Sequence, residues 1–290
     1  MGKQAILITA YRDEENLLRL VNHFSDDSSF RVLVHIDKKC KEIDVGKVMA
    51  LGGGGGDNVI CRYDIVWGSI NHLFAVLDLM KLAMVDSEVE YVHLISGSDM
   101  PTKTAKWFVE RFSACQESFV DFECKGHVRG REDWYCKWHL PSTWHFKGLT
   151  RLDRIFLELQ RKLHIHRRMI GEVDVEALSS GLIWGSFSRK MCEEFIDFAA
   201  LHPKFLACLN TTTIPEEAYI ASVAFKSGLS CSEKGYGRYS VWSRERGNPA
   251  FLDERDYEAI VASECFFARK VDSCKSRKLL DRVYKEISSW

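Results

Sequence analysis

Two adjacent acids, Glu216 and Glu217, follow a proline in the segment Thr213–Glu217. A carboxylate can accept the proton of an attacking hydroxyl, so the pair is a candidate for general-base chemistry. Thr213 and Glu216 have the spacing of a capping box, and Pro215 suits the first turn of a helix, so a structural role would suffice for Glu216. Glu217 has no capping role. The helix dipole alone could explain an acid there, and we expect that dipole to keep Glu217 ionised at neutral pH, as a base must be.

A basic pair, Arg269-Lys270, follows the apolar run Cys265-Phe266-Phe267. Arginine offers phosphate a two-pronged donor and lysine a point charge, so the pair could hold a leaving diphosphate. The start of a solvated basic helix is the alternative. No Asp-x-Asp stands at a strand end, where only Asp99 supplies a carboxylate, so we expect no metal ion and no cofactor.

Composition narrows the class of protein. The chain has 290 residues, a net charge of −1, 46% hydrophobic and 28% charged residues, as is ordinary for a globular protein. Such a charge draws no nucleic acid, so no nucleic-acid partner is expected. The ten cysteines form no CxxC pair or zinc-like spacing, which favours free thiols in a reducing cytoplasm.

The sequence passes from Met1-Gly2-Lys3-Gln4 straight into the strand-like run Ala5–Thr9. We find no signal peptide and no apolar run long enough to cross a bilayer, so the expected location is the cytoplasm, with peripheral contact on the inner face of the membrane. The glycine run Gly52–Gly56 lacks the Lys-Ser/Thr of a phosphate loop and is interpreted as a surface connection.

Strand and helix signals alternate along the first 125 residues. The strand-like runs are Ala5–Thr9, Arg31–Ile36, Val59–Tyr63, Tyr91–Ile95 and Phe119–Phe122, and the helical patterns are Glu14–Phe24, Ile70–Met84 and Ala105–Phe112. This alternation predicts an α/β fold with a mostly parallel central sheet and helices on both faces. Ligands of such sheets bind beyond the carboxyl ends of the strands, which directs attention to residues 10–13, 35–38 and 96–99.

The second part of the chain is less regular at its start. Residues 125–147 are rich in tryptophan, histidine and basic side chains without a clear period, and either a functional loop or an amphipathic hairpin would explain them. Beyond them we expect helices at 149–169, 191–201, 215–227, 254–263 and 275–288, and strands at 181–187 and 239–242. We expect a single domain, 1–290, with halves 1–124 and 125–290.

Seven segments taken together resemble the core-2/I-branching family of glycosyltransferases, which includes the peptide O-xylosyltransferases. In chain order they are Ala10-Tyr11-Arg12-Asp13-Glu14-Glu15-Asn16-Leu17, His35-Ile36-Asp37-Lys38, Val66-Trp67-Gly68-Ser69, His93-Leu94-Ile95-Ser96-Gly97-Ser98-Asp99-Met100-Pro101, Gly185-Ser186-Phe187-Ser188-Arg189, Pro215-Glu216-Glu217 and Phe266-Phe267-Ala268-Arg269-Lys270.

The resemblance implies a GT-A fold and an inverting, metal-independent transfer of a sugar from a UDP donor to a hydroxyl of a glycan acceptor. N-acetylglucosamine is the favoured sugar and bacterial surface polysaccharide synthesis the favoured setting. UDP-xylose, UDP-galactose or UDP-glucose are alternative donors. A nucleotide- or carbohydrate-binding protein without activity is the alternative from another class.

The resemblance also implies roles for single residues. The second acid of the Pro-acid-Glu motif, Glu217, maps to the catalytic base. The donor-binding positions are His35, Asp37, Asp99, Arg246, Arg269 and Lys270, with Arg244 as an alternative to Arg246. The acceptor-binding positions are Glu123 and Trp242. From the residues alone, a buried His35, an Asp99 that caps a turn and a Trp242 in the core remain open alternatives.

One feature owes nothing to the resemblance. The segment 147–169 is basic on one side and apolar on another. The cations are Lys147, Arg151, Arg154, Arg161, Lys162, Arg167 and Arg168, against Asp153 and Glu158. Such a helix could pack its apolar face on the domain, or it could contact an anionic membrane that carries a lipid-linked glycan acceptor.

Overall fold

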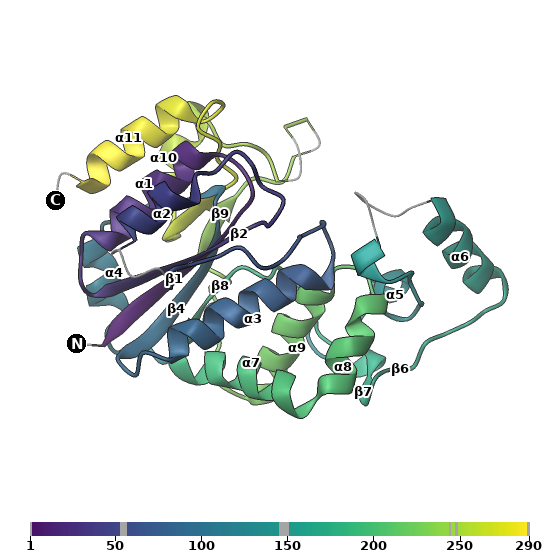
Figure 1. Ribbon diagram of the computed structural model, residues 1–290. Helices are drawn as coiled ribbons and strands as arrows, with labels where there is room; N and C mark the ends of the chain where they lie inside the picture. Colours follow the sequence, from purple (N-terminus) through teal and green to yellow (C-terminus); the bar gives the residue numbers. More distant parts are fainter. Residues whose placement is uncertain (1, 53–56, 145–150, 244, 247–248, 289–290) are drawn as a thin grey trace. The chain divides into compact units, whose positions relative to one another are not determined.

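The computed structural model describes residues 2–52, 57–144, 151–243, 245–246 and 249–288 (Figure 1). The chain forms two compact units. Unit 1 contains Met1–Arg62, Leu82–Gln116 and Tyr236–Trp290, and unit 2 contains Tyr63–Lys81 and Glu117–Gly235. The structure therefore divides the chain differently from the expected halves 1–124 and 125–290, because the C-terminal segment returns to unit 1.

Unit 1 is built on parallel strands in the order β3-β2-β1-β4. These are β1 (Lys3–Ala10), β2 (Phe30–Ile36), β3 (Val59–Ile60) and β4 (Val89–Ser96). The residues of β1, β2 and β4 are almost continuously apolar and buried, as expected for strands covered on both sides, whereas the edge strand β3 is half-buried. The predicted α/β class with a mostly parallel sheet is confirmed.

The helices of unit 1 are α1 (Glu14–Ser25), α2 (Val45–Leu51), α4 (Ala105–Phe112), α10 (Tyr257–Ala262) and α11 (Arg277–Ser288). Asp13 is the N-cap of helix α1, and its carboxylate accepts a hydrogen bond from the Asn16 amide. Arg19 of α1 pairs with Asp281 of α11 at 2.7 Å, and the two helices lie side by side in Figure 1. An early helix and the last helix of the chain are thus in contact within unit 1.

A second, small sheet of unit 1 has the order β5-β10-β9, with β5 (Asp99–Pro101), β9 (Arg238–Ser240) and β10 (Phe267–Arg269). Strand β10 is antiparallel to β5 and parallel to β9. The centroid of the Phe267 ring lies 5.2 Å from that of Phe108 in α4 and 5.8 Å from that of His93 in β4. This aromatic core holds the end of β10, and with it Lys270, at a defined position.

Unit 2 is mostly helical. Its elements are most of α3 (Ile70–Met84), α5 (Glu132–Tyr135), α6 (Arg151–Lys162), α7 (Arg189–Leu201), α8 (Pro203–Cys208) and α9 (Pro215–Ser227), with short strands β6 (Met169–Ile170), β7 (Val173–Asp174) and β8 (Gly185–Ser188). The Tyr219 hydroxyl of α9 donates to the carbonyl of Phe195 in α7. The strand expected at 119–122 is reduced to a single bridge between Phe119 and Ser186.

Irregular backbone prevails over the described part of 125–147, which contains α5 and one 3-10 turn at Ser142–Trp144. No helix in the described part of the chain has both the length and the apolarity needed to cross a membrane. The ten cysteines are unpaired.

Candidate functional site

Helix α9 presents the two acids of the sequence motif at its start. Ile214 occupies the N-cap in a left-handed conformation, φ 49°, and no side chain caps the helix. The predicted capping box is therefore wrong: the Thr213 hydroxyl lies 3.1 Å from Nδ1 of His139, and Glu216 lies 3.4 Å from Nδ1 of His72. The left-handed residue moves the N-cap one position beyond Thr213, so this hydroxyl no longer faces the first helical amides.

Glu217 is the more accessible of the two acids, whereas Glu216 is buried. Burial raises the pKa of Glu217 to about 8, and the neighbouring charges of Glu216, Glu123 and Asp121 act in the same direction, while Arg131 opposes them. The expectation that the helix dipole keeps Glu217 ionised at neutral pH is wrong, because desolvation outweighs the helix end. A carboxyl with this pKa is a strong base once it is ionised.

The predicted acceptor residue Glu123 belongs to the same electrostatic neighbourhood as Glu217 within unit 2. Its Oε2 accepts hydrogen bonds from Nε and Nη2 of Arg131, the first at 3.0 Å. The Arg131 guanidinium lies 3.8 Å from the Trp134 ring centroid. Acid, guanidinium and indole form a half-exposed polar surface of the kind that binds sugar hydroxyls and C–H faces.

In unit 1, three cations gather around the ring of Phe251. The distances to the ring centroid are 4.1 Å from Lys275 Nζ, 5.2 Å from Lys270 Nζ and 5.5 Å from Arg12 Cζ. We call Arg12, Lys270 and Lys275 the cation cluster. Arg12 follows β1, and Lys270 follows β10, so elements far apart in sequence bring these charges together.

The cation cluster is short of negative charge. Within the described part of the chain, none of its three members forms an ion pair, and Nε and Nη2 of Arg12 are buried without a hydrogen-bond partner. Burial lowers the pKa of Lys270, and repulsion by Arg12, Arg269 and Lys275 lowers it further, while Asp99 attracts. A bound dianion would relieve both the repulsion and the unsatisfied guanidinium.

Arg269 and Asp99 pair with each other inside unit 1. The Nε of Arg269 lies 3.4 Å from Oδ1 of Asp99, and both residues are buried. Oδ2 of Asp99 accepts from the Ser96 hydroxyl at 2.7 Å and from the Ser96 amide, closing the turn after β4. Arg269 is thus turned inward against Asp99, whereas Lys270, the residue after β10, contributes its ammonium to the cation cluster. The alternative of a basic helix start is excluded, because Arg269 ends a strand.

Arg246 is held by carboxylates of its own unit. It forms a bidentate pair with Asp256, at 2.9 and 2.6 Å, and also donates to the Phe251 carbonyl. The hydrogen bonds that it donates to Asp256 raise the pKa of Arg246. The guanidinium thus supports the loop that carries Phe251. The alternative, Arg244, lies outside the described residues.

The remaining donor and acceptor positions differ in exposure. His35 is fully buried in β2, as its structural alternative requires. Asp37 is buried just after β2 and accepts a hydrogen bond from the Lys39 amide at 3.1 Å. Trp242 is 56% exposed and donates from Nε1 to the Ser240 hydroxyl, so the alternative of a core tryptophan is excluded.

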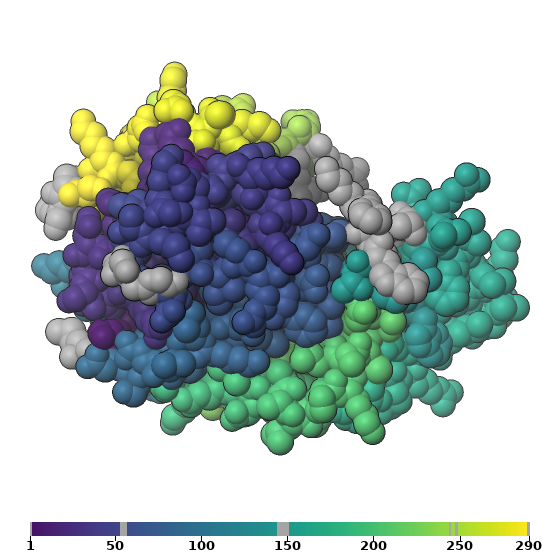
Figure 2. Space-filling model, in the orientation of Figure 1, coloured from purple at the N-terminus to yellow at the C-terminus, as the bar shows by residue number. Residues whose placement is uncertain are grey.

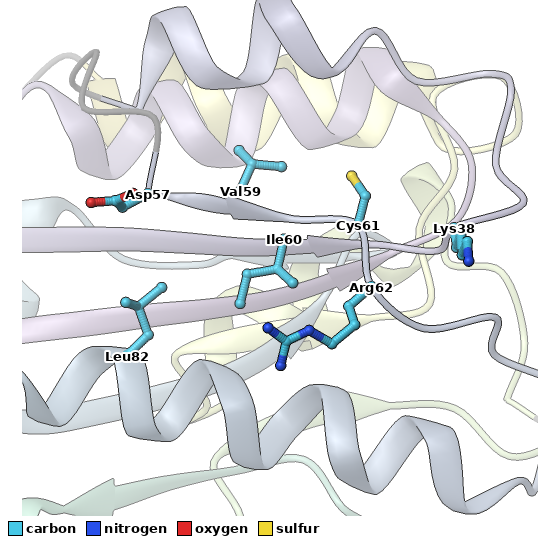
Figure 3. Close-up of a pocket in the computed structure, with 7 residues that line it drawn as sticks. All are labelled: Lys38, Asp57, Val59, Ile60, Cys61, Arg62 and Leu82. Atoms are coloured by element: carbon cyan, nitrogen blue, oxygen red, sulfur yellow. The ribbon is translucent and has the colours of Figure 1, made fainter.

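An open hollow of 630 Å³ runs along edge strand β3 (Figure 3). Val59, Ile60 and Cys61 form its strand side, and Leu82 of α3 its lower wall in this view, while Lys38, Asp57 and Arg62 complete the lining. Lys38 places the hollow beside the carboxyl end of β2, where open parallel sheets bind ligands. It includes none of the cation cluster.

Sequence reasoning missed Arg12, Lys275 and Arg131 as site residues. Arg12 lies in a loop that was singled out at a strand end, but its unsatisfied buried nitrogens become visible only in the fold. In the described residues, no three His, Cys, Asp or Glu side chains gather in a way that could hold a metal ion. Independence from metals stays a prediction.

No protein-family model matches the chain, and comparison with curated proteins finds no match.

Proposed function

We propose that the protein is an inverting glycosyltransferase of the GT-A type that moves a sugar, N-acetylglucosamine in the favoured case, from a UDP donor to a hydroxyl of a glycan acceptor. The observation that carries the proposal is the cation cluster, three converging positive charges in which two buried guanidinium nitrogens of Arg12 have no hydrogen-bond partner. The ordered resemblance to core-2/I-branching glycosyltransferases supports it.

The residues can supply each part of the reaction. The acceptor oxygen attacks the anomeric carbon of the donor while its proton passes to the Glu217 carboxylate. The bond from the anomeric carbon to the diphosphate oxygen breaks, and its electron pair leaves with UDP. Arg12, Lys270 and Lys275 neutralise the charge that develops on the diphosphate, the role that a divalent ion has in other nucleotide-sugar enzymes.

The acceptor side draws on a polar pair in unit 2 and an exposed indole in unit 1. Glu123 and Arg131 offer an acceptor and donors to sugar hydroxyls in unit 2, and Trp242 offers its face in unit 1. The proposed place of the reaction is the cytoplasm, with bacterial surface polysaccharide as the product. UDP-xylose, UDP-galactose and UDP-glucose are the alternative donors.

UDP titration tests the donor site. Lys270→Ala and Arg12→Ala should each weaken UDP binding at least about tenfold, because each removes a charge-assisted hydrogen bond to the diphosphate. Lys278→Ala is the matched control, since this exposed lysine lies only 3.8 Å from one surface glutamate and should bind UDP normally. Unchanged UDP affinity in both cluster variants would exclude the cluster as the diphosphate site.

Turnover of a panel of UDP-sugars, followed by mass spectrometry, tests the reaction. One donor should be hydrolysed or transferred, with EDTA present, and Glu217→Gln should retain UDP binding while losing about 10²–10⁴-fold in rate. Turnover that depends on added Mn²⁺ or Mg²⁺ would refute the metal-independent mechanism. UDP binding without turnover of any donor would favour the non-catalytic binding protein.

A further inference from the structure

Helix α6 exposes its apolar face and buries a polar one. At about 100° per residue, Asp153, Leu157 and Gln160 share one face, and these three are the buried residues of the helix. About a quarter turn away lies a continuous apolar face whose members are 36% to 69% exposed. These members are Leu152, Ile155, Phe156, Leu159 and Leu163, which we call the α6 apolar face.

Polar contacts explain this orientation. Oδ1 of Asp153 accepts a hydrogen bond from the Leu140 amide at 2.9 Å. The Gln160 side chain bonds both ways with Trp138, accepting from its amide at 2.9 Å and donating to its carbonyl at 2.7 Å. These directed bonds fix the buried face of α6 against 138–140. The expectation that the helix packs its apolar face on the domain is therefore wrong.

The third face of α6 is basic and also exposed. Arg151, Arg154, Arg161 and Lys162 lie on it with a single acid, Glu158. Arg161 is paired with Asp133 at 2.6 Å and with Glu158 at 3.2 Å. Within the described part of the chain, Arg151, Arg154 and Lys162 have no acidic partner. Three of these arginines border a shallow hollow of 510 Å³.

The structure differs in two details from the membrane segment expected at 147–169. The helix ends at Lys162 rather than near 169, and Lys147 lies outside the described residues. Arg167 is buried and donates to the carbonyls of Met169, Thr211 and Cys208, so it belongs to the framework of unit 2. The solvent-facing cations are those of α6 and Arg168.

We propose that α6 docks the protein on an anionic lipid bilayer, with the α6 apolar face inserted at the headgroup–acyl boundary. Charge complementarity selects this occupant: Arg151 and Lys162 flank the apolar face, where they meet lipid phosphates as the leucines enter the boundary. Figure 2 shows this teal segment at the molecular surface. The inference holds whether or not the protein transfers sugars.

Sedimentation with vesicles tests the proposal. Phosphatidylcholine vesicles are compared with phosphatidylcholine/phosphatidylglycerol vesicles, at low and high salt. The protein should bind the anionic vesicles, and high salt should weaken that binding because it screens the cations. Ile155→Ser/Leu159→Ser should lower the affinity roughly 100-fold by removing inserted apolar area. Arg151→Gln/Lys162→Gln should lower it roughly 25-fold, about fivefold for each cation.

Matched controls lie elsewhere on the surface. Val85→Ser/Leu201→Ser removes two apolar side chains that are 77% and 75% exposed, and Lys106→Gln/Lys278→Gln removes two exposed cations. Both controls should bind vesicles like the parent protein. All four variants should keep the parent thermal midpoint, since the altered side chains face solvent.

Several results would overturn the proposal. These are equal binding to neutral and anionic vesicles, no binding to either, or unchanged binding in the α6 variants. A lower thermal midpoint in Ile155→Ser/Leu159→Ser would show that the face is packed. A dimer in analytical ultracentrifugation that this variant abolishes would assign the face to a second copy of the chain.

Discussion

Glu216 and Glu217 are adjacent, yet their surroundings give them different chemistry. The raised pKa of Glu217, about 8, means that its carboxylate form is the minority at neutral pH. A base in this state gains activity as the pH rises through about 8. The same shift also affects stability. Between the ordinary pKa of an unfolded glutamate and the raised pKa of about 8, the unfolded chain has already released this proton while the folded chain still holds it, so the free energy of unfolding falls as the pH rises through this range.

Glu216→Gln tests the coupling between the two acids. Removing the Glu216 charge should lower the pKa of Glu217, so the rising limb of the pH–rate profile should move to lower pH by about 0.5–1 unit. The amide is nearly isosteric and can still hydrogen-bond His72, so stability should change little. The measurement is the pH dependence of kcat/KM, or of the pre-steady-state rate of sugar transfer, in the variant and the parent. A limb at the same pH in the variant and the parent would contradict the coupling.

The residue types and their spacing were enough to make Glu217 and Lys270 candidates, whereas Trp242 was implied only by the family resemblance. They did not predict the raised pKa of Glu217, since that depends on burial and on acids from 121–123, far away in sequence. Nor did they separate Lys270 from Arg269. Only the fold shows that Arg269 pairs with the buried Asp99 while the Lys270 ammonium belongs to the cation cluster.

At the scale of elements, the residue directly before β9 must be a glycine. Gly237 has φ +71°, and a Cβ there would come within 2.2 Å of the Phe266 ring. Gly237→Ala should therefore destabilise the protein by about 2–4 kcal/mol, through a left-handed penalty and a clash with a packed ring. Urea unfolding measures the difference.

Gly235→Ala is the control for that change. Its φ of +76° is similar, but nothing lies within 4 Å of an added Cβ, so only the backbone penalty of about 1–2 kcal/mol should remain. Equal losses in the two variants would mean that the Phe266 ring moves aside freely, and that the aromatic core does not fix the β9–β10 region.

Helices with clear signals were predicted well from the sequence. The bounds of α9, Pro215–Ser227, agree with the expected helix, and those of α1 and α4 agree within a residue. The short strands β5 and β10 were missed because three residues carry no measurable period, and tertiary pairing alone defines them. Helix α6 was expected at 149–169 but ends at Lys162, and its periodicity left open which face packs on the domain, because a pattern does not reveal the bonds of Asp153 and Gln160.

At the scale of the molecule, unit 1 is assembled from three separate stretches of chain. Deleting residues 236–290 removes β9 and β10, and so takes away the partner of β5 and the Phe267 ring of the aromatic core. The truncated chain should lose its cooperative thermal transition and bind a hydrophobic dye such as ANS. Circular dichroism and dye fluorescence measure this. A truncated chain with the parent midpoint would show that unit 1 does not depend on its C-terminal stretch.

The pairing of β5 with β10 also determines how long β5 must wait for its strand partner while the chain is being translated. Met100 leaves the ribosome long before its strand partner Ala268 is translated. At ordinary elongation speeds of about 5–20 residues per second, the gap lasts roughly 8–35 seconds. Throughout that interval the edge of β5 and the rings around Phe108 lack their final cover. We therefore expect the nascent chain to expose apolar surface to chaperones while the second stretch of unit 2, Glu117–Gly235, is being synthesised.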